Sequence, residues 1–182
     1  MLLDLFHQIY ASDLSKISVA MLVLLIAWSV FGALFYKKMR LIGTVLAVVF
    51  VAVIIYGTIL SRTTGVRTHD FIPFSSFYKA VEQTEIYRSM LMNIFLFIPI
   101  GLTLPFAFKG SKTKCFFLAT LCGFSLSVAI EIIQLCFSLG LAETDDIICN
   151  TIGTTLGCCS YLLASFWRAI MLKYGKDKKT NE

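Results

Sequence analysis

The sequence predicts an all-α fold, a polytopic membrane helix bundle with about five transmembrane helices. Hydrophobic residues make up 58% of the 182 residues, and the mean hydropathy is +0.82, which is too apolar for a water-soluble domain. The apolar runs approach the roughly 20 residues needed to cross a hydrocarbon core about 30 Å thick. We expect one membrane domain over residues 1–182, with spans at 17–36, 41–60, 90–108, 115–138 and 146–168.

Two segments outside these spans have patterns of their own. Residues 1–16 place Leu2, Leu5, Phe6 and Ile9 on one helical face, which is typical of a short helix lying at the membrane interface. Residues 61–88 are polar around an apolar cluster, which indicates an outer-face loop or re-entrant segment.

The third span contains Pro99, Gly101 and Pro105. Since proline removes a backbone donor and clashes with the preceding turn, we expect this helix to be kinked or partly opened near its middle.

Basic residues gather in short clusters at the ends of the apolar runs, which fits membrane topology and not nucleic-acid binding. If the loop at 37–40 is cytoplasmic, the loop at 109–114 and the C-terminal tail are also cytoplasmic, because successive loops lie on alternate sides of the membrane. That side then holds eleven of the sixteen Lys and Arg residues. We therefore predict a multi-pass membrane protein with its N-terminus outside and its C-terminus cytoplasmic.

Polar residues from several spans are expected at one depth, in the outer leaflet. At 1.5 Å per residue, Glu131 lies about 24 Å along the fourth span, and an ionisable residue at such a place is by default a functional-site candidate. Ser127 and Glu131 share a helical face with Gly123, while Asp146, Asn150 and Thr154 share one on the fifth span. Because Gly153 and Gly157 form a small-xxx-small pair nearby, we expect these two faces to meet.

Each polar residue also has a structural interpretation. Thr144 and Asp145 suit a helix start, where they would cap free N–H groups. Asn93, Gln134 and Asn150 could join helices by hydrogen bonds, and Glu131 could form an ion pair with an arginine of the 61–88 segment. The six cysteines lie in apolar surroundings without a CxxC pair, so a metal or redox motif has little support.

Four runs of residues, in order, resemble the VanZ-like family of bacterial membrane proteins. They are HDFIPFSSFYKA at 69–80, NIFLFIPIGLTLPFAF at 93–108, EIIQ at 131–134 and DDIICNTIGTTLG at 145–157, and the similar region covers about residues 57–165. The resemblance marks as family positions Pro73, Asn93, Pro99, Gly101, Pro105, Glu131, Gln134, Asp146, Asn150, Gly153 and Gly157. Many relatives place an arginine and a further aspartate before the paired aspartates, where this chain has Gly140 and Glu143.

The resemblance implies a role in resistance to teicoplanin, a lipoglycopeptide that binds cell-wall precursors, and it implies no established reaction. We expect a non-enzymatic protein without a cofactor, whose outer-leaflet polar pocket engages a membrane lipid, either a lipid-linked cell-wall precursor or a phospholipid headgroup. Arginines would hold a phosphate, and the acids and amides would meet sugar, amine or peptide groups. The candidate pocket residues are Glu131, Gln134, Asp145, Asp146, Asn150, Asn93, Arg62, Arg67 and Arg88.

Two alternative functions, one enzymatic and one in transport, would use residues of the same set. An intramembrane metal-dependent hydrolase would use Glu131, Asp145 and Asp146 as oxygen ligands, although the sequence has no HExxH motif or histidine cluster. A small transporter would use Glu131 as a proton carrier, although no internal repeat is evident. The sequence specifies no oligomeric state.

Overall fold

A computed structural model describes residues 14–66 and 68–180, with only the backbone given for 14, 15 and 175–180. The interfacial helix expected at residues 1–16 lies outside this part, apart from its last three residues. The described chain contains five long helices: α2 (Leu14–Leu34), α3 (Met39–Ile55), α5 (Thr84–Ala107), α6 (Lys112–Phe137) and α7 (Thr144–Thr180). All five are long and apolar enough to cross a membrane. The prediction of an all-α polytopic bundle is confirmed.

The helix ends are set by local signals. Ser111 precedes α6, and its hydroxyl accepts a hydrogen bond from the backbone N–H of Lys114 at 3.2 Å, as an N-cap does. At the other end of α6, Ser138 and Gly140 adopt positive φ angles of 55° and 138°, which stop the helix and turn the chain toward α7. Helix α5 remains helical through Pro99 and Pro105, so it is not opened there, and the kink expected at these prolines stays a prediction.

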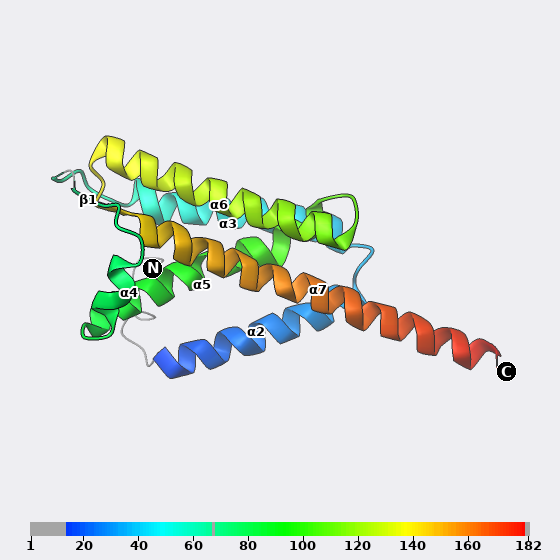
Figure 1. Ribbon diagram of the computed structural model, residues 1–182. Coiled ribbons are helices and arrows are strands. Elements are labelled where there is room, and N and C mark those ends of the chain that lie inside the picture. The colour runs from blue at the N-terminus through cyan, green and yellow to red at the C-terminus, as the bar shows by residue number, and fades with distance from the viewer. Residues whose placement is uncertain (1–13, 67, 181–182) are drawn as a thin grey trace.

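Helix α7 is central to the bundle and packs against α5, α6 and α2, while α3 packs against α5 (Figure 1). Glycines bring α5 and α7 together. A Cβ added to Gly157 would lie 2.8 Å from the Cα of Gly101, and one added to Gly153 would collide with the Ile94 carbonyl. Close approach of two backbones at small residues is the usual means of packing helices in a membrane.

The segment between α3 and α5 does not span the bundle, as predicted. It comprises a π-helical turn, η1 (Tyr56–Leu60), a short strand, β1 (Thr68–Asp70), and a short helix, α4 (Ser75–Ala80). Strand β1 pairs in parallel with β2 (Leu141–Glu143), which lies between α6 and α7. The sequence did not predict this strand pair. It joins the 61–83 segment to the start of α7.

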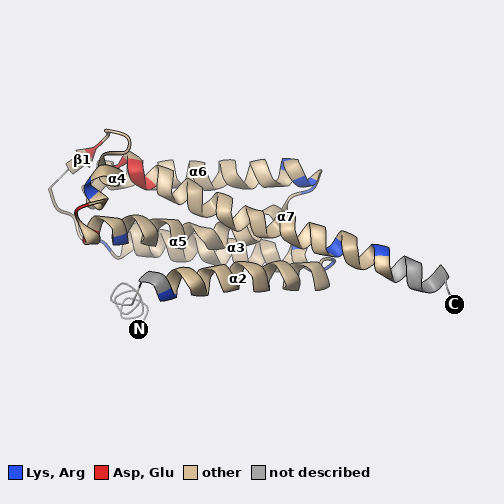
Figure 2. Cartoon of the chain, turned by 60° about the horizontal axis from the view of Figure 1, so that its bottom comes forward, with Lys and Arg blue, Asp and Glu red and all other residues tan. Residues whose placement is uncertain are grey.

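Charge is distributed unequally between the two ends of the bundle (Figure 2). We call the end that carries β1, α4 and β2 the acidic end. We call the opposite end, with the turn at 35–38 and the loop at 108–111, the basic end. Asp70, Glu143, Asp145 and Asp146 belong to elements of the acidic end, whereas residues 86–130 contain no Asp or Glu.

Candidate functional site

At the acidic end, the last turns of α6 and the first turn of α7 bring two carboxylates together. The Glu131 Oε2 atom accepts a hydrogen bond from the Glu143 backbone N–H at 3.1 Å. The Asp146 Oδ1 atom accepts one from the Asn93 side-chain amide on α5 at 2.6 Å. Glu131 and Asp146 are close enough to repel each other, and Glu143 repels both. We call Glu131, Glu143 and Asp146 the acidic cluster.

Arg62 supplies positive charge beside this cluster. Its guanidinium attracts both Glu131 and Asp146, and its Nη1 atom donates to the Leu139 carbonyl at 3.3 Å. That nitrogen lies 2.5 Å from where a Cβ on Gly140 would be, so the glycine leaves room for the guanidinium. Arg62 therefore stands at the turn where many relatives are expected to have an arginine of their own.

Asp145 has a structural partner on another element. Its Oδ1 atom accepts the backbone N–H of Phe74 at 2.6 Å, and its Oδ2 atom accepts that of Ser76 at 2.7 Å. These amides open α4, and the φ angle of 66° at Phe74 turns the chain so that both point at the carboxylate. Asp145 thus caps α4 and not its own helix, as its place at a helix start had suggested.

Gln134 and Asn150 form the interhelical bonds that the sequence allowed. The Gln134 side-chain amide donates to the Thr58 carbonyl in η1 at 3.0 Å, and the Asn150 amide donates to the Ser127 hydroxyl at 2.8 Å. The Asn150–Ser127 bond joins the two polar faces that were predicted to meet. Among the described residues, no donor reaches the buried Oδ1 atom of Asn150.

Two of the three candidate arginines are not placed in the cluster. Arg67 lies outside the described residues, and Arg88 is half-buried in the first turns of α5. The structure therefore brings together Glu131, Asp146, Asn93 and Arg62 from the predicted set. It adds Glu143 and Ser76, whose hydroxyl lies 3.5 Å from a Glu143 oxygen. Glu143 was noticed in the sequence only as a departure from the family pattern.

A second charged group lies on the surface of the outer segment. The Lys79 ammonium donates to an Asp70 oxygen at 2.9 Å, and the Ser75 hydroxyl donates to the same oxygen at 2.8 Å. These bonds, with that of Lys79 the strongest cause, lower the pKa of Asp70 to about 2. Burial has the opposite effect on Glu143, whose pKa is raised above its ordinary value of 4.5.

The geometry gives little support to the hydrolase alternative. In the described part of the chain, no group of three or more His, Cys, Asp or Glu side chains is arranged to hold a metal ion. Both oxygens of Asp145 already accept backbone hydrogen bonds, so this side chain is engaged in holding α4.

Two cavities of the described structure lie away from the acidic cluster. One, of about 340 Å³, is at the basic end between the 35–38 turn and α7. The other, of about 290 Å³, lies along α2 beside Trp28. Neither borders Glu131 or Asp146, so a pocket at the acidic cluster stays a proposal.

Comparison with known proteins identifies the family. A model of the VanZ/LLP1 family matches residues 39–167, which is more than half of the chain. Protein VanZ of Enterococcus faecium is 38% identical over 101 residues, covering 54% of this chain and 55% of that protein. The chain therefore spans about half the length of this relative in the match. No solved structure matches the chain significantly. With its five apolar helices, the chain is a multi-pass membrane protein that belongs to the VanZ/LLP1 family.

Proposed function

We infer that this protein lowers the susceptibility of a bacterial cell to lipoglycopeptides of the teicoplanin type. Its acidic cluster, together with Arg62, would engage a headgroup in the outer leaflet, either that of a lipid-linked cell-wall precursor or that of a phospholipid. The observation that supports this most is that Glu131 and Asp146, from neighbouring helices, lie near enough to repel each other. Both are inside apolar spans, where an ionised side chain is costly.

The chemistry of the cluster defines what it would bind. Three carboxylates stand beside one guanidinium, so the site favours a ligand with an amine or hydroxyl groups for the acids. The Arg62 side chain is exposed and planar, and a guanidinium of this kind suits a phosphate oxygen. A headgroup with a phosphate next to a sugar, amine or peptide group offers both.

The test is the teicoplanin concentration that inhibits growth of cells producing each variant, with membrane levels measured in parallel. Glu131→Gln and Asp146→Asn keep the shape of each side chain and remove its charge. We expect both variants to reach normal membrane levels and to give no more protection than cells lacking the protein.

The matched control is Glu82→Gln, which removes an exposed glutamate of the outer segment away from the cluster. It should protect like the wild type. If Glu131→Gln and Asp146→Asn were well produced and protected equally well, the acidic cluster would have no part in this function.

A further inference from the structure

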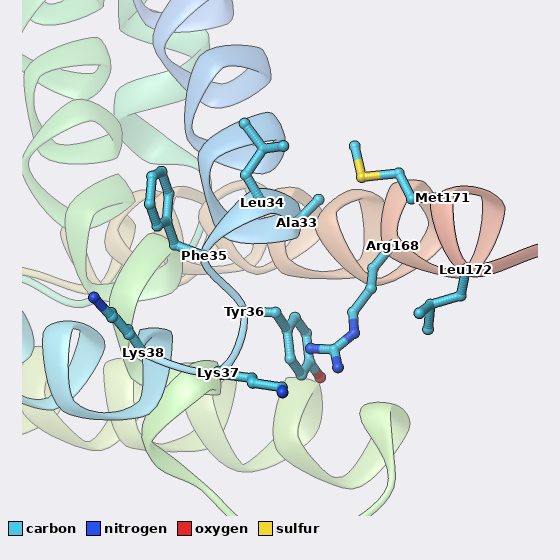
Figure 3. A pocket seen from close by; sticks show the side chains of 9 residues that line it. All are labelled: Ala33, Leu34, Phe35, Tyr36, Lys37, Lys38, Arg168, Met171 and Leu172. Carbon is cyan, nitrogen blue, oxygen red and sulfur yellow. The ribbon is translucent and has the colours of Figure 1, made fainter. Parts of the chain in front are cut away.

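The cavity at the basic end combines positive charge with an apolar wall (Figure 3). Lys37 and Lys38 come from the turn after α2, and Arg168 comes from α7. Leu34, Met171 and Leu172 add exposed apolar side chains from the same two helices. A cavity of about 340 Å³ is within the size range of small-ligand sites.

Arg168 is held in place by an aromatic ring anchored in the bundle. Its guanidinium carbon lies 3.9 Å from the centre of the Tyr36 ring, a cation–π contact. Tyr36 in turn packs edge-on against Phe106, with ring centres 6.2 Å apart, and Phe106 is part of the buried core. The guanidinium thus has a fixed position, which lowers the entropy cost of binding a ligand.

One nitrogen of the same guanidinium has no acceptor in the described part of the chain. Its Nη1 atom is buried, yet no described residue accepts a hydrogen bond from it. A buried donor without a partner is costly, so an acceptor from outside the chain is favoured here.

Among the described side chains, the positive charge of this cavity has no acidic neighbour in its lining. None of the lining residues is acidic, and the sequence has no Asp or Glu at 14–69, 86–130 or 147–176. In Figure 3 the Lys37 ammonium ends near the Tyr36 ring and the Arg168 guanidinium, whereas Lys38 extends to the other side of the turn. Lys37 and Arg168 are therefore the two cations best placed to share one anion.

We propose that this cavity binds an anionic phospholipid of the adjoining leaflet. The guanidinium of Arg168 and the ammonium of Lys37 hold its phosphate, and an acyl chain lies against Leu34, Met171 and Leu172. Basic pockets between transmembrane helices are suited to such headgroups, because the cations gain both charge pairing and a hydrogen-bond acceptor. The site is at the opposite end of the bundle from the acidic cluster and does not depend on the function proposed for that cluster.

Native mass spectrometry of the purified full chain tests the proposal in micelles containing equal amounts of phosphatidylglycerol and phosphatidylcholine. We expect the wild type to retain phosphatidylglycerol in preference to phosphatidylcholine. Arg168→Gln and Lys37→Gln should each weaken this preference, and the double variant should lose it.

One further variant, Lys112→Gln, and the position of Lys37 make the result decisive. Lys112→Gln removes a cation of the same end of the bundle that does not line the cavity, and it should keep the wild-type preference. Lys37→Gln lies in an exposed turn, so it reports on binding even if Arg168→Gln disturbs the fold. Equal retention of both lipids by the wild type, or an equal loss of preference in Lys112→Gln and Lys37→Gln, would overturn the proposal.

Discussion

At the scale of single residues, the acidic end shows that neighbouring aspartates have different roles. Asp145 is only 2% exposed and its carboxylate holds α4 by two backbone hydrogen bonds, whereas Asp146 accepts a hydrogen bond from Asn93 and belongs to the acidic cluster. Two adjacent residues of a helix point about 100° apart, which is why one faces the outer segment and the other faces α5. Asp145 and Asp146 therefore link the outer segment at α4 to the acidic cluster.

Replacing Asp145 should consequently loosen the outer segment. Asp145→Ala leaves the Phe74 and Ser76 amides without their acceptor, and hydrogen bonds to a charged group contribute about 1.5–3 kcal/mol each. We expect a loss of about 3–6 kcal/mol in the free energy of unfolding and faster amide hydrogen exchange at residues 74–76. Glu82→Ala, which removes an exposed carboxylate after α4, should leave exchange at these two amides unchanged.

Glu143 gives a prediction about pH. Burial raises its pKa, so the folded protein disfavours the ionised form relative to the unfolded chain. The stability that this group contributes is present below its ordinary pKa of 4.5 and is lost as the pH rises through the raised value. Glu143→Gln should match the wild type in acid and unfold at a higher temperature at neutral pH. A difference in melting temperature that did not grow with pH would contradict this account.

At the scale of helices, the polar face of α7 at Asn150 and its glycine face at Gly153 and Gly157 contact two different neighbouring helices. Ser127 on α6 bonds Asn150, but Gly153 and Gly157 contact α5, which corrects the expectation that both stripes meet α6. At about 100° per residue, Asn150 lies on one edge of a broad face and Gly153 on the other. Because α7 lies between α5 and α6, the two edges meet different helices.

The α5–α7 contact is tight enough to predict the effect of one methyl group. In Gly157→Ala the new Cβ would collide with the Ile98 carbonyl and lie 2.8 Å from the Gly101 Cα, so the helices must move apart. Overpacking of this kind costs about 1–3 kcal/mol. Thermal unfolding in detergent should show the loss for Gly157→Ala but little change for Gly57→Ala, where an added Cβ meets nothing within 4 Å.

The helices of the molecule were predictable from the sequence, whereas the contacts of its non-helical segments were not. Bilayer thickness fixes the length of a span, and helical periodicity fixes which face it presents, so the five helices and the Asn150–Ser127 contact could be foreseen. The β1–β2 pair, the bonds from Phe74 and Ser76 to Asp145, and the place of Arg62 beside Gly140 could not. These contacts join segments about 70 residues apart through non-helical backbone, for which no periodic signal exists.

At the scale of the whole molecule, the charge asymmetry predicts orientation. The basic end should be cytoplasmic and the acidic end outside, because loops rich in Lys and Arg remain inside. In a chain whose six cysteines are replaced, Val81→Cys should react in intact cells with a membrane-impermeant thiol reagent, and Lys112→Cys should not. Both positions are exposed, so the reverse pattern would mean the opposite topology.

The central claim is that the acidic cluster binds a lipid headgroup. The most direct measurement is mass spectrometry of the lipids that copurify with the wild type and with the double variant Glu131→Gln, Asp146→Asn. We predict that the double variant lacks a lipid that the wild type retains, while Arg168→Gln still retains that lipid and shows only a weaker preference for phosphatidylglycerol. An identical set of lipids in the wild type and the double variant would contradict a binding role for the acidic cluster.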